Sequence, residues 1–272
     1  MKKILRSSVN AIPSAMRGWI KHIPGVATLQ QLLIRNVLSG EPFEHIINAG
    51  PAAGLKFDIT LPLDKAIWAG VYEPQFSAAI SKAVALGDVC YDVGGYRGYM
   101  SGAMALAGAS KVIVFEPLPA NQRALERLSF LNPGLCIELK CLALGDTDGS
   151  MHLRVMADTS MGKLVTSTFQ PGVKGIGEIR VAVRTIDSMV TGLEIAPPQV
   201  IKIDVEGAEM DVLRGAAEVL RIHRPRIFLE AHSLALEEAC SAELARHNYN
   251  VRRLELSPVR DEDTRHLIAF AR

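Results

Sequence analysis

The sequence predicts an α/β protein built on a mostly parallel seven-stranded sheet, with helices on both faces and an antiparallel hairpin at the carboxyl end. Short apolar runs typical of buried strands alternate with longer segments of helical periodicity along most of the 272 residues. Several runs end in an acidic residue, and the last two, 249–256 and 266–271, have no helix between them. Helix-linked parallel strands place ligands at their carboxyl ends.

A strand and the glycine turn after it are central to this prediction. Asp92 places a carboxylate near the carboxyl end of a short apolar strand. Gly94, Gly95 and Gly98 let the backbone turn sharply and approach a ligand before a helix begins at 99–106. This is the outline of a small-molecule site. The alternative is an ordinary strand-to-helix turn that needs glycine only for steric reasons.

The turn departs from the dinucleotide-binding pattern G-x-G-x-x-G. Tyr96 stands where that pattern needs a glycine so that the backbone can approach a pyrophosphate. The sequence therefore argues against a nicotinamide-dependent dehydrogenase. The spacing D-x-G-x-x-x-G, from Asp92 to Gly98, is instead typical of class I S-adenosylmethionine methyltransferases, whose cofactor carries no phosphate.

Composition indicates one globular domain with a modest extension. The chain is 49% hydrophobic and 22% charged, and its net charge of +1 provides no electrostatic reason to expect a nucleic-acid partner. Its four cysteines form no C-x-x-C pair, which favours reduced thiols and a cytoplasmic protein. No apolar run approaches the length of a membrane span.

Residues 1–54 are predicted to form a basic helical extension, and residues 55–272 the catalytic domain. The first 40 residues contain six Lys or Arg and no acid. We favour helices that cap the sheet or form a dimer contact, because amphipathic helices usually serve packing. The alternative is a surface that touches anionic lipid or an anionic substrate carrier.

A second strand, 111–115, also ends in an acid. A carboxylate at Glu116 can accept hydrogen bonds from both hydroxyls of a ribose. Pro117 precedes the predicted helix 119–131, whose amino end the same charge would stabilise. Both interpretations can hold together.

Apolar and polar segments follow the third predicted strand. Leu142 and Ala143 are candidates to cover one face of an adenine, or else belong to the core. Residues 150–156 and 179–184 alternate like a pair of edge strands. The polar stretch 158–178 between them is a candidate substrate lid, because long loops in compact domains are usually functional.

A fourth strand is followed by three acids within six residues. Asp204, Glu206 and Glu209 come directly after the apolar run, and a fifth strand ends just before His232. Because neighbouring parallel strands end at the same edge of a sheet, we expect these side chains to converge. Charges that stabilise a helix start and a buried, hydrogen-bonded histidine are the alternatives. The acids also suit a divalent cation, but we expect no metal.

From Trp68 onward the sequence resembles the FkbM-type methyltransferases, which use S-adenosylmethionine to modify hydroxyls of sugars, polyketides and related natural products. The most specific match is Lys202-Ile203-Asp204-Val205-Glu206-Gly207-Ala208-Glu209. The first turn departs from the family pattern, with Gly95, Tyr96 and Arg97 in place of Ala, Asn and an apolar residue. Other matching residues are Gly70, Tyr72, Glu73, Tyr91–Gly94, Gly98, Tyr99, Phe115–Pro117, Ala143–Asp146, Thr185–Asp187, Arg214, Gly215, Glu230 and His232.

The resemblance implies a Rossmann-like class I methyltransferase that uses S-adenosylmethionine. Methyl transfer to an alcohol needs alignment of the acceptor oxygen and removal of its proton. We expect His232 to act as the base in its neutral form, with Asp204 and Glu206 beside it as further catalytic residues. The residues expected to bind the cofactor are Tyr72, Glu73, Asp92, Gly94, Gly95, Tyr96, Gly98, Glu116, Pro117, Leu142, Ala143 and Asp204.

The resulting prediction is a cytoplasmic O-methyltransferase that acts on a small hydroxylated acceptor, a sugar or a polyketide. It has no nucleic-acid partner and no transmembrane segment, while the basic amino-terminal segment leaves a homodimer or a peripheral membrane contact open. N-methylation of an amino sugar or peptide is one alternative. A non-catalytic binding module, suggested by the altered turn at Gly95-Tyr96-Arg97, is another.

Overall fold

The computed structural model describes residues 41–156, 162–164, 175–254 and 265–272. The chain divides into two compact units, Met1–Pro74 and Gln75–Arg272. The basic segment 1–40 lies outside the described residues, so its helices and both interpretations of its surface stay predictions. The division expected after residue 54 also stays a prediction.

The described part of the first unit is small. It contains an antiparallel strand pair, β1 (Phe43–Ile46) and β2 (Lys56–Ile59), and a single-turn helix, α4 (Lys65–Trp68). The side chains that form its core are those of Ile47, Leu55, Phe57, Ile59, Leu61 and Ile67, all buried.

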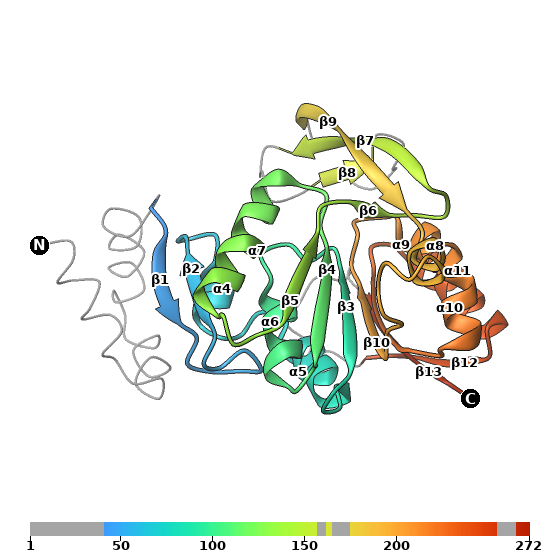
Figure 1. Cartoon of the computed structure of the whole chain (residues 1–272), viewed down its shortest axis with the longest axis horizontal. Coiled ribbons are helices and arrows are strands. Elements are labelled where there is room, and N and C mark those ends of the chain that lie inside the picture. The colour runs from blue at the N-terminus through green and yellow to red at the C-terminus, as the bar shows by residue number, and fades with distance from the viewer. Residues whose placement is uncertain (1–40, 157–161, 165–174, 255–264) are drawn as a thin grey trace, which may run out of the picture. The chain divides into compact units, whose positions relative to one another are not determined.

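The second unit is built on a seven-stranded sheet with the order β12-β13-β11-β10-β3-β4-β5 (Figure 1). Each adjacent pair from β11 to β5 is parallel, whereas β13 is antiparallel to both β11 and β12. The predicted sheet and its closing hairpin are therefore confirmed. The strands are β3 (Val89–Val93), β4 (Lys111–Phe115), β5 (Ile137–Lys140), β10 (Val200–Ile203), β11 (Arg226–Ala231), β12 (Tyr249–Arg253) and β13 (Arg265–Ala271).

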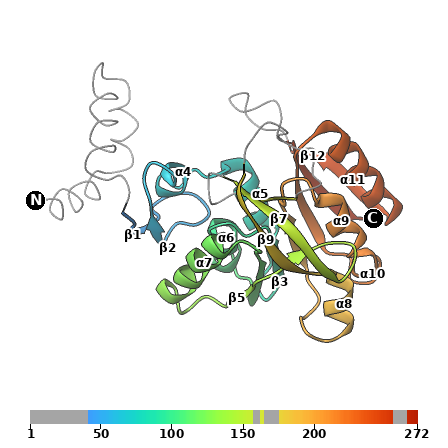
Figure 2. The same cartoon turned by 90° about the horizontal axis from the view of Figure 1, so that it is seen from above.

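Helices cover both faces of this sheet, with α6 and α7 on one face and α8 to α11 on the other (Figure 2). Ser233 caps α11, because its hydroxyl accepts a hydrogen bond from the amide of Leu236 at 3.1 Å. The helices of this unit are α5 (Pro74–Ala83), α6 (Tyr99–Leu106), α7 (Pro119–Leu131), α8 (Ile186–Thr191), α9 (Glu209–Arg214), α10 (Ala217–Ile222) and α11 (Leu234–Arg246).

The main core lies between the sheet and helices α8 to α11. Alternate strand residues, such as Tyr91, Val93, Ile201 and Ile203, pack into it. Because successive strand side chains point to opposite faces, the residues between them, Asp92 among them, point to the face of α6 and α7. Polar side chains on that face therefore sit inside an otherwise apolar sheet.

A second, four-stranded sheet has the order β6-β9-β7-β8. Its strands are β6 (Ala143–Leu144), β7 (Gly149–Met156), β8 (Gly162–Leu164) and β9 (Gly175–Arg184). The predicted pairing of 150–156 with 179–184 is confirmed. The expected loop 158–178 is interrupted by β8 and by the start of β9, and its remainder lies outside the described residues.

This second sheet packs beside the end of β4. Leu118, three residues beyond β4, forms a small core with Leu153 of β7 and Val181 of β9. The four-stranded sheet therefore lies at the edge where the parallel strands end, as Figure 1 shows. Among the described residues, no helix is long and apolar enough to cross a membrane.

Candidate active site

Polar side chains of neighbouring strands lie in rows on one face of the main sheet. In the strand register, Asp92 of β3 lies beside Lys202 of β10. Glu230 of β11 lies beside His266 of β13, and the Nε2 of His266 is 3.1 Å from the Oε2 of Glu230. Asp204 comes two residues after Lys202 and extends the row beyond the strand. These rows reach the edge at which the parallel strands end.

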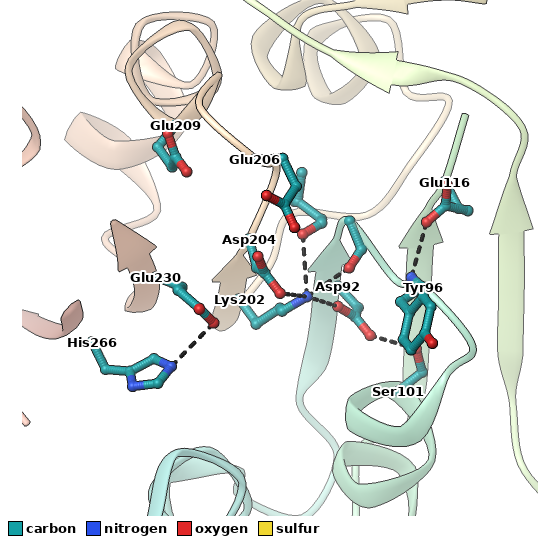
Figure 3. Close-up of polar contacts among 12 residues, drawn as sticks. Asp92, Tyr96, Ser101, Glu116, Lys202, Asp204, Glu206, Glu209, Glu230 and His266 are labelled. Carbon is teal, nitrogen blue, oxygen red and sulfur yellow. Dashed lines mark hydrogen bonds and ion pairs between the residues drawn. The ribbon is translucent and has the colours of Figure 1, made fainter. Parts of the chain in front are cut away.

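Lys202 lies at the centre of these rows and is buried. Its Nζ donates to the carbonyl of Gly94 at 2.6 Å and forms ion pairs with Asp92 Oδ1 at 3.1 Å and Asp204 Oδ2 at 3.4 Å (Figure 3). Asp92 is fully buried, and its Oδ2 accepts a hydrogen bond from Ser101 Oγ at 2.5 Å. The protein itself therefore engages both carboxylate oxygens of Asp92.

The predicted glycine turn forms directly after β3. The amides of Gly94 and Gly95 both donate to the carbonyl of Phe115, at 3.0 and 3.3 Å. Gly94 has φ +75°, and a Cβ added there would lie 1.8 Å from the carbonyl oxygen of Asp204. No side chain fits at that position. Tyr96, with φ +49°, occupies the left-handed region without being glycine.

Glu116 joins this turn to the end of β4. Its Oε2 accepts from the amide of Tyr96 at 2.9 Å and its Oε1 from the amide of Leu118 at 2.9 Å. Burial raises the pKa of Glu116 to about 7, although these hydrogen bonds and the charge of Lys202 act in the opposite direction. The Asn121 side chain also donates to this carboxylate. Because a carboxylate has about four acceptor sites, it keeps capacity for a further donor.

Three further residues predicted to line the cofactor site lie near Glu116. The amide of Glu116 donates to the carbonyl of Lys140 at the end of β5, and so does the amide of Leu142. Leu142 packs against the main core, and Ala143 packs against the small core beside the second sheet. Pro117 is half-buried between β4 and α7. Pro117, Leu142 and Ala143 thus follow the ends of β4 and β5.

Tyr72 and Glu73 belong to the first compact unit, after α4. Glu73 has φ +40°, an uncommon backbone conformation for a residue with a side chain. Their expected part in cofactor binding stays a prediction.

His232 meets the acidic residues that follow β10. Its Nδ1 is 2.6 Å from Glu209 Oε1, and its Nε2 is 3.6 Å from both Asp204 Oδ1 and Glu206 Oε2. Glu209, fully buried at the first residue of α9, also accepts from the amide of Gly207 at 3.1 Å. The three residues predicted to be catalytic therefore lie together.

Proton affinities in this group differ from those of isolated side chains. Burial by itself lowers the pKa of His232, but the hydrogen bond to Glu209 and the charges of Asp204 and Glu206 raise it to about 10. Burial raises the pKa of Glu206 to about 7, although the charge of His232 opposes that shift. At neutral pH, His232 carries a proton. The group that gains or loses a proton near pH 7 is Glu206.

The same side chains include a donor set for a cation. Asp204, Glu230 and His232 each offer one atom of a ligating type, and the three atoms lie within 4.8 Å of one another. Such a set suits a hard divalent ion. Protein groups already contact all three: Lys202 pairs with Asp204, His266 with Glu230, and Glu209 with His232. The expectation of no metal stays a prediction.

Comparison with known protein families assigns the domain. Residues 92–270 match the family model described as the methyltransferase FkbM domain. This range covers more than half of the chain. The chain belongs to the FkbM methyltransferase family. The resemblance seen in the sequence is confirmed.

Several known proteins are similar to this chain in sequence or in structure. The hexuronic acid methyltransferase AglP of Haloferax volcanii is 30% identical over 136 residues, 49% of this chain and 52% of that protein. The chain thus spans about half the length of the curated relative it matches. The methyltransferase FkbM of Methylobacillus flagellatus KT has a TM-score of 0.51 at 18% identity, over 68% of this chain and 44% of that chain. A Streptococcus mutans structure has a TM-score of 0.52 at 12% identity, over 90% of this chain and 64% of that chain.

These structural similarities confirm the predicted Rossmann-like fold of this FkbM methyltransferase.

The sequence assigns no catalytic or binding role to three residues of the methyltransferase site. Lys202 belongs to the matching motif, Ser101 to the helix predicted at 99–106, and Glu209 to a predicted helix start. A lysine inside an apolar central strand was the available signal, because such a charge must have a buried partner. The partner itself, Asp92, becomes evident only from the register of β3 with β10.

Proposed function

We propose that this FkbM methyltransferase transfers the methyl group of S-adenosylmethionine to a hydroxyl of a sugar or a related natural product in the cytoplasm. The observation that carries the proposal is that two chemically different groups share the carboxyl edge of one sheet. The glycine turn and Glu116 form one group, and His232, Asp204 and Glu206 form the other. One suits a nucleoside and the other suits a hydroxyl that must lose its proton.

The first group fits the nucleoside part of the cofactor. Glu116 is buried and held by two backbone amides and the Asn121 side chain, yet its carboxylate keeps acceptor capacity for a ribose hydroxyl. Leu142 and Ala143 add apolar surface nearby, where we place the adenine. Gly94 and Tyr96 shape the backbone of the turn. S-adenosylmethionine, when bound, supplies an activated methyl group.

The second group handles the acceptor hydroxyl. An alcohol is a weak nucleophile, so a side chain must accept its proton as the oxygen reaches the methyl carbon. His232, protonated and held by Glu209, orients the neighbouring carboxylates. We assign proton acceptance to Glu206, because its pKa of about 7 is matched to neutral pH, and acceptor orientation to Asp204. The neutral imidazole base expected from the sequence is less suited, because the pKa of His232 is about 10.

A sugar acid is the acceptor we would test first. The relative AglP is a hexuronic acid methyltransferase by its description. Neutral sugars and polyketide alcohols are the next acceptors to test, because the residues of the site supply a proton acceptor for any hydroxyl. Amino sugars test the alternative of N-methylation.

Calorimetric titration with S-adenosylmethionine and S-adenosylhomocysteine tests the cofactor assignment. We expect micromolar binding by the wild type and a loss of about tenfold or more in the Glu116→Ala variant, because the ribose loses its hydrogen bond to this carboxylate. Glu218→Ala is the matched control, since the Glu218 side chain is exposed on α10 and forms an ion pair with Arg221. Binding of neither ligand by the wild type would favour the non-catalytic binding module.

A radiolabelled methyl-transfer assay tests the acceptor. Glucuronic and galacturonic acid, their neutral parent sugars and an amino sugar are compared under the same conditions. Transfer to a hydroxyl supports O-methylation. Transfer confined to the amino sugar would replace the proposal with N-methylation.

A further inference from the structure

Lys202 connects the two groups of side chains that make up the methyltransferase site. Its Nζ contacts the carbonyl of Gly94 and the carboxylate of Asp92 on one side, at 2.6 and 3.1 Å. On the other side it contacts Asp204 Oδ2 at 3.4 Å. The opposite oxygen of Asp204 lies 3.6 Å from His232 Nε2. Charges of opposite sign thus alternate across β3, β10 and the end of β11.

We propose that Lys202 is a positioning residue that couples the cofactor turn to the acceptor-side carboxylate. It acts through Asp92 and Gly94 on the turn and through Asp204 on the group around His232. The proposal rests on the function proposed above. Neither the family match nor the relatives assign a role to this lysine.

The chemistry of an ammonium group suits this task. Lysine has three donors on a compact head, and Lys202 directs them to acceptors from three separate segments: β3, the turn after it and the loop after β10. The head is buried, so water does not compete for these contacts. A small shift of the lysine would therefore move the turn and Asp204 together.

Two separable effects follow from loss of this charge. Asp92 would be a fully buried carboxylate whose cationic partner is missing, which destabilises the fold. Asp204 would lose the contact that orients it, which reduces the rate of the chemical step. A lysine that serves only to neutralise Asp92 would produce the first effect without the second.

The test compares three proteins with the wild type. Lys202→Met removes the charge at similar length, and Asp92→Asn/Lys202→Met replaces the buried ion pair with a neutral pair that still has a partner for Ser101. The matched control is Lys111→Met, which removes an ion pair of 3.0 Å from a partly exposed site at the start of β4. Thermal unfolding, calorimetric affinity for S-adenosylmethionine and methyl transfer to glucuronic acid are measured for each.

We expect Lys202→Met to lower the unfolding midpoint and to weaken cofactor binding about tenfold or more, because a buried carboxylate loses its partner. The double variant should recover the midpoint but only part of the affinity, because the contact with Gly94 stays lost, while kcat stays about 100-fold below the wild type, since a misplaced group costs that much. Lys111→Met should match the wild type in cofactor affinity and kcat.

Full recovery of kcat in the double variant would overturn the proposal, because Lys202 would then only neutralise Asp92. Wild-type affinity and kcat in Lys202→Met would overturn it as well. A mutant cycle of Lys202→Met and Asp204→Asn in thermal unfolding needs no ligand, and additive effects there would refute the link to Asp204. If the wild type binds no S-adenosylmethionine, the proposed function fails, while this cycle still decides whether Lys202 and Asp204 are coupled.

Discussion

The hydrogen bond between His232 Nδ1 and Glu209 Oε1 determines how protons are arranged in the site. At 2.6 Å, and with Glu209 fully buried, it holds the imidazole in one orientation. The other ring nitrogen then faces Asp204 and Glu206 rather than solvent. A protonated histidine in this setting stabilises the neighbouring carboxylates. Because its own nitrogens already carry protons, a carboxylate rather than the imidazole accepts the proton of the acceptor.

Substitution of Glu206 tests that assignment. We expect Glu206→Gln to lower kcat by about 100-fold or more, the usual contribution of a general base, with little change in cofactor affinity. In the wild type, kcat should rise as the pH rises through about 7, because burial raises the pKa of Glu206 to about 7 and only its ionised form accepts a proton. Glu218→Gln, on the exposed side of α10, serves as the control. A flat pH profile would show that another group accepts the proton.

Removal of metal ions tests the role of Asp204, Glu230 and His232. These three side chains already contact Lys202, His266 and Glu209, respectively. We therefore expect methyl transfer to be unchanged after treatment with EDTA and dialysis. An activity that is lost with EDTA and restored by Mg²⁺ or Mn²⁺ would instead assign the three to a cation.

At the scale of secondary structure, two of the family's matching segments hold elements together. Thr185 caps α8 by accepting from the amide of Ser188, and Asp187 accepts from the amides of Glu218 and Val219 at the start of α10. These contacts satisfy amides that a helix start leaves without partners. The Thr-Ile-Asp segment is therefore structural.

Gly215, at the end of α9, serves a similar purpose. A Cβ at this position would lie 1.9 Å from the carbonyl oxygen of Gly145, which follows β6. The close approach of these two backbones explains the glycine at position 215, whereas a Cβ on Gly145 would lie 2.9 Å from the side chain of Val183.

Loss of the Asp187 cap should reduce stability without reducing cofactor affinity. We expect Asp187→Ala to lower the free energy of unfolding by about 1–2 kcal/mol, the usual cost of a lost cap. Glu194→Ala, which removes an exposed ion pair with Arg184, should cost less than about 1 kcal/mol. Chemical denaturation and calorimetric titration measure the two quantities. A loss of affinity in Asp187→Ala would give this segment a part in binding.

Substitution in the glycine turn after β3 should reduce the free energy of unfolding more than loss of the Asp187 cap does. Gly94→Ala would place a methyl group 1.8 Å from a backbone oxygen at a residue with φ +75°, so the turn cannot keep its geometry. We expect a loss of about 3 kcal/mol or more in the free energy of unfolding. Gly134→Ala is the control, because nothing lies within 4 Å of its Cβ position. Equal stability of the two variants would contradict the described turn.

For the whole molecule, buried ionisable groups predict a pH dependence of stability. The folded-state pKa of His232 is raised to about 10, so its stabilisation is fully present below about 6.5 and is lost as the pH rises through 10. Burial raises the pKa of Glu116 and Glu206 to about 7, so each carboxylate is increasingly unfavourable in the folded state between about 4.5 and 7. All three contributions decrease stability as the pH rises.

We therefore expect the free energy of unfolding to be higher at pH 6 than at pH 9. The Glu116→Gln variant should lose part of the decrease between pH 5 and 7, roughly 1–3 kcal/mol, because its neutral side chain does not titrate. Denaturant titrations at fixed salt measure both. A free energy of unfolding that rises between pH 6 and pH 9 would contradict the raised pKa values of His232, Glu116 and Glu206.

The alternation of strands and helices, the closing hairpin and the positions of the acids at strand ends could all be predicted from the sequence alone. These are local properties, since periodicity and glycine turns depend on neighbouring residues. Because parallel strands end at one edge, the meeting of Asp204, Glu206 and His232 could also be predicted.

The tertiary structure decided which of these groups touch and which are charged. Asp92 and Lys202 are far apart in the chain and meet only through the register of β3 with β10. The proton on His232 depends on the burial of Glu209, which α9 provides. Register, burial and local charge are properties of the packed chain, because each depends on contacts between residues distant in sequence. Periodicity could therefore locate the site but not the proton acceptor within it.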